Sequence, residues 1–304
     1  MKIAITGATG LVGKGLVRHL EQQGHEIHPM VRRKGDQTGR GIYWDPGKGE
    51  IDSAGLEGMD AVIHLAGENL SGYWTAAKKE RIMASRRDGT RLLSSVLAGL
   101  KQRPTLLIST SATGFYGDRG DTILDESAGS GKGFLAEVCL AWEKAADPAR
   151  EAGIRVVHSR FGIILDPRGG ALGKLLPLLR AGMGGRLGSG RQYWSWITMH
   201  DIHRALSFCL KQPGLAGAVN FTAPEPSTNT EFTKAAARFL HRPAVFAAPA
   251  FALRLALGEM ADEMLLGSAR VLPQKLLAAG FRFEHPDLAA ALPFVLGLKP
   301  ASLL

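Results

Sequence analysis

The stretch Ile3-Ala4-Ile5-Thr6-Gly7-Ala8-Thr9-Gly10-Leu11-Val12-Gly13 decides the fold of this chain of 304 residues. A short apolar run leads into three spaced glycines, and an amphipathic helical pattern follows over residues 11–23. In a dinucleotide-binding turn the first glycine permits the tight turn, the second lets the backbone approach a pyrophosphate, and the third allows close packing of helix on strand. The helix N-terminus adds unpaired N–H groups and the positive end of its dipole. We therefore predict a phosphate-binding turn, whose residues are Gly7, Thr9, Gly10, Leu11, Val12 and Gly13.

The end of the second predicted strand, residues 26–31, indicates which dinucleotide binds. Proteins that prefer NAD carry Asp or Glu there, about 20 residues past the glycines, to hold a ribose 2′-hydroxyl. Here the chain reads Val31-Arg32-Arg33-Lys34. Cations suit a 2′-phosphate, and Arg32 can bind it through two hydrogen bonds. The alternative is a solvated basic turn. We predict NADP(H) rather than NAD(H), with Arg32 as the recognition residue.

Apolar β-branched runs alternate with helical patterns over the first part of the chain, which is typical of a parallel sheet covered by helices on both faces. The expected strands are residues 2–6, 26–31, 61–66, 105–109 and 155–158, and the expected helices are 11–23, 75–103 and 134–151. The pattern predicts an α/β fold of the Rossmann type, a doubly wound parallel sheet over residues 1–160, to which residues 193–222 return. Residues 161–304 are expected to form a smaller, mainly helical substrate lobe, with its helical end at 245–300.

Composition excludes several classes of protein. Only two cysteines occur, Cys139 and Cys209, without a CxxC motif, so we expect neither a disulfide scaffold nor a metal site. The net charge of +9 comes from dispersed basic residues without a nucleic-acid-binding motif, so no nucleic-acid partner is expected. No apolar run reaches the roughly 20 residues of a membrane span. Glycines interrupt the N-terminal apolar run, which argues against a secretory signal and for the cytoplasm.

The chain resembles the extended and atypical short-chain dehydrogenase/reductases, and most closely their epimerase family subgroup. The resemblance spans essentially the whole length. It is carried by the glycine turn, His64-Leu65-Ala66-Gly67-Glu68-Asn69, Ser85-Arg86, Ser109-Thr110-Ser111-Ala112-Thr113-Gly114-Phe115-Tyr116-Gly117, Arg160-Phe161-Gly162, Trp194-Ser195-Trp196-Ile197, Asn220-Phe221-Thr222-Ala223-Pro224 and Leu272-Pro273-Gln274-Lys275. It implies that Leu65, Ala66 and Gly67 lie against the adenosine side of the cofactor. It also implies that Arg86 points toward the cofactor and that the segment after Arg160 approaches the nicotinamide.

The catalytic set of this family is incomplete here. Short-chain dehydrogenases use a Tyr as acid or base, a Lys four residues later that lowers its pKa, and a Ser that orients the substrate. Ser111 matches the serine. None of the four tyrosines has a Lys four residues on, and the expected positions hold Leu135 and Cys139. Tyr116 is a candidate acid, with packing in the pocket wall as its alternative.

Other polar residues near these motifs have plain structural explanations. Lys132 reads as a solvated loop lysine, and His64 as a core histidine with its hydrogen bonds satisfied. Glu68-Asn69 could position a substrate group or could shape the cofactor site. The aromatic run at residues 193–196 could line a substrate pocket or pack in the core.

Two functions remain open on these residues. The first is an NADP(H)-dependent oxidoreductase or epimerase acting on a small molecule, with Ser111 and Tyr116 as catalytic candidates. The second is a non-catalytic NADP(H)-binding sensor or scaffold, which the missing Tyr and Lys favour. Pairing of the two long helices, near residues 75–103 and 134–151, would give a homodimer.

Overall fold

The computed structural model describes residues 1–32 and 40–298, so Arg33 and Lys34 of the predicted ribose-binding turn lie outside it. No helix within these two ranges is long and apolar enough to cross a membrane. The chain divides into two compact units. Unit 1 comprises Met1–Ser111, Glu137–Arg160 and His203–Val219, and unit 2 comprises Ala112–Ala136, Phe161–Ile202 and Asn220–Leu304.

An eight-stranded sheet in the order β12-β8-β6-β5-β1-β2-β3-β4 forms the centre of unit 1. Its strands are β1 (Lys2–Thr6), β2 (Glu26–Val31), β3 (Ile42–Asp45), β4 (Glu50–Ile51), β5 (Ala61–His64), β6 (Leu106–Ala112), β8 (Arg155–Phe161) and β12 (Gly217–Phe221). β1 pairs in parallel with β2 on one side and with β5 on the other, β5 pairs in parallel with β6, and β4 is an antiparallel addition at the edge. The predicted parallel sheet is confirmed. The strand order reverses between β1 and β5, and ligands of open α/β sheets bind at such a switch point, beyond the carboxyl ends of the strands.

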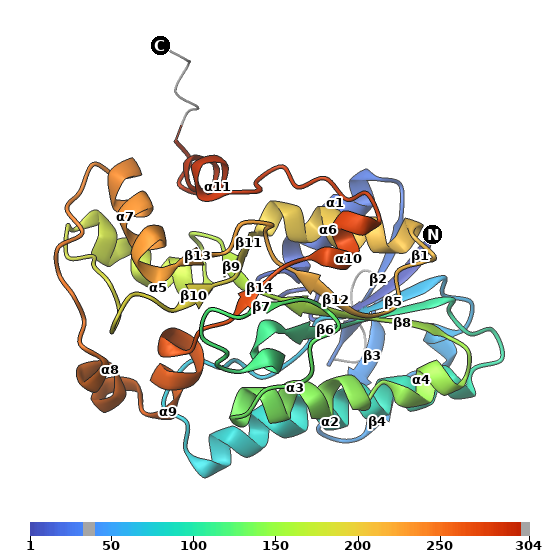
Figure 1. Ribbon diagram of the computed structural model, residues 1–304. Coiled ribbons are helices and arrows are strands. Elements are labelled where there is room, and N and C mark those ends of the chain that lie inside the picture. Colours follow the sequence, from blue (N-terminus) through green and yellow to red (C-terminus); the bar gives the residue numbers. More distant parts are fainter. Residues whose placement is uncertain (33–39, 299–304) are drawn as a thin grey trace. The chain divides into compact units, whose positions relative to one another are not determined.

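Helices cover both faces of this sheet (Figure 1). α1 (Gly13–Gln22) and α6 (Met199–Lys211) lie on one face, and α2 (Ala76–Gly99), α3 (Phe134–Lys144) and α4 (Asp147–Glu151) lie on the other. The helix predicted over residues 75–103 is present as α2, and its Leu93 and Leu97 pack in one core cluster with Val62 of β5. α2 begins after Thr75, whose hydroxyl accepts the N–H of Lys78 as an N-cap.

The single helix predicted over residues 134–151 is wrong, because the structure has two helices there. α3 ends at Lys144 and α4 begins at Asp147. Pro148 lies in the first turn of α4, where a proline is tolerated because its missing N–H would have no partner inside the helix. In the middle of one continuous helix the same proline would remove a hydrogen bond and clash with the preceding turn.

Unit 2 contains three small two-stranded pairings and most of the C-terminal helices. β9 (Ile163–Leu165) pairs with β11 (Trp196–Thr198), β10 (Tyr193–Trp194) with β13 (Ser227–Thr228), and β7 (Ile123–Leu124) with β14 (Arg270–Val271). The helices are α5 (Gly170–Arg180), α7 (Asn229–Phe239), α8 (Ala250–Leu257), α9 (Glu259–Ala261), a π-helical turn at Asp262–Leu266, α10 (Gln274–Ala278) and α11 (Leu288–Val295). Trp194, Trp196 and Phe232 form the aromatic part of their shared core. The predicted helical C-terminal region is therefore present.

The boundaries of the two units differ from the predicted domains. Residues 112–136, predicted with the sheet, belong to unit 2, and of residues 193–222 only 203–219 lie in unit 1. The chain leaves the sheet after β6 and rejoins unit 1 at Glu137. Local periodicity predicts the strands and helices, but it does not show which core an irregular segment packs against.

Candidate functional site

The glycine turn after β1 leaves backbone N–H groups open. Gly7 has φ +67°, a conformation that favours glycine, and its carbonyl accepts the N–H of Gly10 at 2.9 Å. A Cβ on Gly13 would stand 2.2 Å from the Gly7 oxygen, so only glycine lets α1 start this close to the turn. No side chain caps α1, and within the described residues the N–H groups of Leu11 and Val12 have no hydrogen-bond partner. Thr9, Gly10 and Leu11 are exposed. This is the arrangement that binds phosphate oxygens.

A buried chain of hydrogen bonds joins this turn to the loop after β5. The Thr6 hydroxyl oxygen accepts the N–H groups of Leu65 at 3.0 Å and Ala66 at 3.2 Å, and it lies 2.7 Å from His64 Nδ1. Burial lowers the pKa of His64 to about 4, so the ring is neutral at neutral pH. Because the Thr6 oxygen already accepts two N–H groups, its own O–H donates to Nδ1, and the ring proton on Nε2 donates to the Thr90 hydroxyl 3.0 Å away. The predicted core histidine is confirmed, and it fixes two neighbouring strand ends to each other and to α2.

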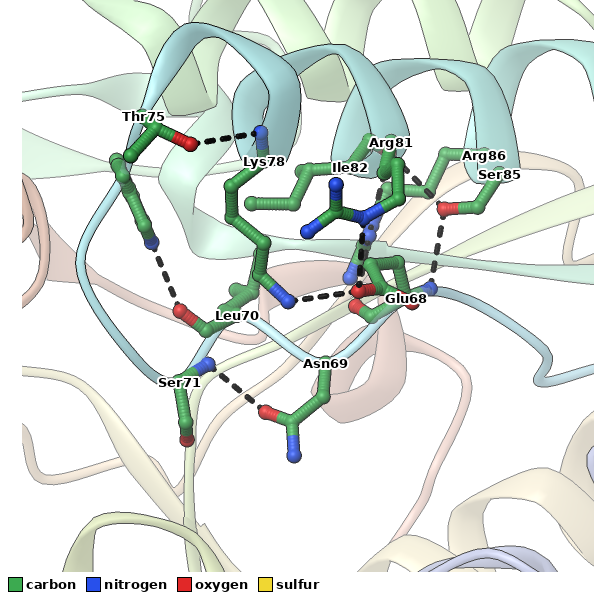
Figure 2. A network of polar contacts seen from close by, with 11 residues as sticks. Glu68, Asn69, Leu70, Ser71, Thr75, Lys78, Arg81, Ile82, Ser85 and Arg86 are labelled. Atoms are coloured by element: carbon green, nitrogen blue, oxygen red, sulfur yellow. Dashed lines mark hydrogen bonds and ion pairs between the residues drawn. The ribbon is translucent and has the colours of Figure 1, made fainter.

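The loop at residues 67–71 is held against α2 by a polar network (Figure 2). The Glu68 N–H donates to Ser85 Oγ at 3.0 Å, and the Glu68 carboxylate accepts a hydrogen bond of 2.7 Å from Lys78 Nζ, with Arg81 Nε at 3.7 Å. The Lys78 ammonium holds the pKa of Glu68 below its usual value. Asn69 accepts the N–H of Ser71. Of the two roles predicted for Glu68 and Asn69, these contacts favour shaping the site.

Arg86 extends from α2 to the same loop. Its Nη1 donates to the backbone oxygens of Glu68 at 3.1 Å and Ile82 at 3.3 Å, and its guanidinium carbon lies 5.0 Å from the centre of the Trp142 ring. A Cβ on Gly67 would stand 3.3 Å from that carbon, so the guanidinium lies directly beside the loop. Arg86 is only 9% exposed, and desolvation lowers its pKa.

Arg32 follows β2 on the edge of the sheet that carries the glycine turn. The register of the parallel pair sets Thr6 beside Met30, so Gly7 and Arg32 both lie beyond the carboxyl ends of neighbouring strands. The Arg32 side chain is exposed. Arg33 and Lys34, the other two cations of the predicted ribose-binding turn, lie outside the described residues.

Ser111 belongs to a buried ionic group in unit 1. Its hydroxyl donates to Glu143 Oε1 at 2.7 Å, and Arg160 donates to both carboxylate oxygens of Glu143 through Nε and Nη2, each at 2.8 Å. A carboxylate can only accept, so the serine proton is committed to Glu143 and its oxygen offers lone pairs. Ser111 is 1% exposed. Glu143 gave no catalytic signal in the sequence, because it lies 32 residues away along the chain.

Tyr116 is fully buried in unit 2. Its hydroxyl lies 2.8 Å from Asn220 Oδ1 and 3.0 Å from the Asp125 carbonyl oxygen. Both neighbours are acceptors, and the single phenolic proton is shared between them. This placement favours the alternative in which Tyr116 packs in the wall of the fold.

A cavity of about 290 Å³ lies within unit 2. Thr113, Leu135, Tyr193 and Trp194 are among its lining residues, together with the charged side chains of Asp118, Lys132, Arg254, Asp262 and Glu263. The Glu263 carboxylate accepts the N–H groups of Phe134 and Leu135, each at 3.1 Å, and so caps the start of α3. Thr113 is a lining hydroxyl that sequence reasoning missed, although it stands two residues past Ser111.

With this geometry established, comparison with known proteins assigns the family. A model described as the NAD dependent epimerase/dehydratase family matches residues 3–220, more than two thirds of the chain. The chain belongs to the NAD-dependent epimerase/dehydratase family. Residues 248–294 match a second model, a domain of unknown function, DUF1731.

Two relatives that match over nearly their whole length are both named epimerase family proteins. Epimerase family protein Mb2239 of Mycobacterium bovis is 42% identical over 96% of both chains, and epimerase family protein YfhF of Bacillus subtilis is 36% identical over 96% of this chain and 97% of its own. The crystal structure of human epimerase family protein SDR39U1 (isoform2) with NADPH is 30% identical, with a TM-score of 0.87 over 97% of this chain and 99% of the human one. The family resemblance and the Rossmann-type fold predicted from the sequence are both confirmed.

This epimerase/dehydratase family member has no phenol or ammonium at the positions where its motif predicts them. Leu135 lines the cavity of unit 2 with an aliphatic side chain, and Cys139 is a buried cysteine on α3. The described residues contain no cluster of His, Cys, Asp and Glu that could hold a metal ion. The family's usual acid and cation are therefore absent from these two positions.

Proposed function

We propose that the chain binds NADP(H) beyond the carboxyl ends of β1, β2 and β5, and that it is an oxidoreductase or epimerase acting on a small molecule. The observation that carries the proposal is the uncapped N-terminus of α1 behind the glycine turn. The open N–H groups of Leu11 and Val12 would receive the pyrophosphate, with the exposed Gly10 offering no side chain in its way. Leu65, Ala66 and Gly67 would hold the adenosine side.

The preference for NADP(H) over NAD(H) is proposed from Arg32. The residue is exposed and stands where an NAD-binding protein would carry a carboxylate. A guanidinium binds a 2′-phosphate through two charge-assisted hydrogen bonds and would gain little from a 2′-hydroxyl. The human relative whose crystal structure contains NADPH supports this choice.

Ser111 is proposed to orient the substrate as a hydrogen-bond acceptor. The bound nicotinamide would supply hydride transfer, and the chain would supply binding and orientation. Because the Ser111 proton is committed to Glu143, its oxygen can receive a hydrogen bond but has none to give. The group that meets Ser111 is therefore a donor such as a hydroxyl.

A second function, a non-catalytic NADP(H) sensor or scaffold, is favoured by one specific observation. Leu135 and Cys139 provide neither the phenol nor the ammonium that the family uses, and general acid–base catalysis contributes about 10²–10⁴-fold to rates. A screen that supplies hydroxyl compounds with NADP+ and carbonyl compounds with NADPH separates the two functions. Net oxidation or reduction is followed by NADPH absorbance, and epimerisation, which leaves the cofactor unchanged, is followed by NMR of the product. Turnover that depends on Ser111 supports the enzyme, and NADPH binding without turnover in either readout across a wide screen supports the sensor.

The remaining expectations about partners and location stay predictions. They are a cytoplasmic location, no nucleic-acid or membrane partner, and a homodimer formed through the helices near residues 75–103 and 134–151. A salt titration of binding to random duplex DNA tests for a nucleic-acid partner, since counterion release gives a steep dependence on salt. Sedimentation at several protein concentrations tests for the homodimer.

A further inference from the structure

We propose that Arg86 takes the place of the missing lysine, and that its guanidinium donates hydrogen bonds to oxygen atoms of the bound dinucleotide. The proposal rests on the dinucleotide site proposed above. It adds that the cation which the family carries on α3, at the position of Cys139, is supplied here by Arg86 from α2.

The guanidinium lies against the face of α3 that carries position 139. Residues three apart on a helix share a face, so Cys139 and Trp142 point in the same direction. The Arg86 guanidinium carbon stands 5.0 Å from the centre of the Trp142 ring, and Cys139 is near enough to interact with it electrostatically. Cys139 and Trp142 are both buried. A lysine at position 139 would bring its ammonium into the region that Arg86 now fills.

The guanidinium also faces the switch point of the sheet. An added Cβ on Gly67 would stand 3.3 Å from its carbon and 3.4 Å from Nη2. Two residues earlier, the backbone carbon of Leu65 would be 3.1 Å from a Cβ on Gly7. The chain from Leu65 to Gly67 therefore touches the phosphate-binding turn at one end and Arg86 at the other. A dinucleotide that extends from the turn along this edge passes the guanidinium.

Arg86 is a buried cation that forms no ion pair with a carboxylate in the part of the chain that the structure describes. Cys139 and Glu68 are the groups whose charge raises its pKa, and the Glu68 carboxylate is already paired with Lys78 and Arg81, as Figure 2 shows. Among the described residues Arg86 makes hydrogen bonds only to two backbone oxygens, both through Nη1. A guanidinium has five N–H donors, and a buried charge without a counter-charge costs free energy. The oxygen atoms of an anionic dinucleotide would provide the missing acceptors.

The test exchanges the cation between the two helices and measures NADPH affinity by fluorescence titration. Arg86→Met should weaken binding at least tenfold. Cys139→Lys in the same chain should restore affinity to within about threefold of the wild type, because the ammonium re-enters the same space from α3. Arg87→Met is the matched control: Arg87 is the next residue on α2, is exposed and pairs with Asp88, so affinity should not change. All variants are first checked for a cooperative thermal transition.

The possible outcomes distinguish a failure of this proposal from a failure of the proposed dinucleotide site. If the wild type does not bind NADPH, the dinucleotide site itself is refuted. If the wild type binds and Arg86→Met binds equally well, or if the folded double variant stays as weak as Arg86→Met, the transfer of the cation is refuted. If the double variant does not fold, Arg86→Lys decides, since a retained positive charge should bind several-fold more tightly than Arg86→Met. Equal losses in Arg86→Lys and Arg86→Met would overturn the proposal.

Discussion

The hydroxyl of Thr6 and the imidazole of His64 share a buried hydrogen bond of 2.7 Å between the carboxyl ends of β1 and β5. Thr6 is the residue before the first glycine of the turn, and His64 is the residue before the loop that would face the adenosine. The same threonine oxygen accepts the N–H groups of Leu65 and Ala66. One side chain thus sets the spacing of the two strand ends between which the dinucleotide is proposed to lie.

This relationship predicts that stability falls in mild acid because of His64. Burial lowers its folded pKa from 6.5 to about 4, so the unfolded chain takes up a proton first as the pH falls. The contribution of His64 is therefore complete above pH 6.5, is lost between about 6.5 and 4, and changes no further below that. The loss amounts to about 3 kcal/mol. Urea unfolding of wild type and His64→Gln between pH 4 and 8 measures it. Parallel pH profiles for the two proteins would contradict the assignment.

Gly10→Val should abolish NADPH binding and leave the protein folded. An added Cβ there meets only the Gly7 oxygen at 3.1 Å on the protein side, so the valine would project to where the pyrophosphate is proposed. Gly99→Val is the control, because a Cβ at that end of α2 meets no atom within 4 Å. Unchanged NADPH affinity in a cooperatively melting Gly10→Val variant would show that the turn serves structure alone.

Ser111→Ala should lower turnover of any substrate that is found, about tenfold or more, without weakening NADPH binding. The alanine removes the oriented lone pairs and leaves the Glu143–Arg160 ion pair, whose two hydrogen bonds of 2.8 Å do not depend on the serine. Turnover and NADPH affinity are measured on the same preparations. Robust turnover in Ser111→Ala would remove Ser111 from the catalytic residues.

Tyr116→Phe separates packing from catalysis. Its hydroxyl is buried between Asn220 and the Asp125 carbonyl, so we expect the loss of unfolding free energy to be on the order of 1–3 kcal/mol. Turnover per folded molecule should stay near that of the wild type. A variant of unchanged stability whose turnover collapses would show instead that Tyr116 acts as an acid.

The sequence predicted what depends on local pattern. The glycine spacing and the alternation of apolar runs were enough to predict the turn, the central strands and α2. Burial of one face of a helix or strand gives a periodic pattern of apolar residues in the sequence, and a tight turn requires glycine at fixed positions. The division of residues 134–151 into α3 and α4 was missed, although Pro148 was a visible signal for it. The missed site contacts are long-range: Ser111 meets Glu143, and Arg86 meets Trp142, only because strands and helices far apart in the chain pack side by side.

The central claim is that an NADP-selective dinucleotide site lies beyond β1, β2 and β5, and calorimetric titration of NADPH and NADH tests it most directly. A charge-assisted contact to the 2′-phosphate stabilises the complex by about 1.5–3 kcal/mol. NADPH should therefore bind at least tenfold more tightly than NADH, and Arg32→Ala should remove most of that difference by weakening NADPH alone. Equal affinities of the wild type for both cofactors, or an Arg32→Ala variant that binds NADPH as tightly as the wild type, would contradict the account.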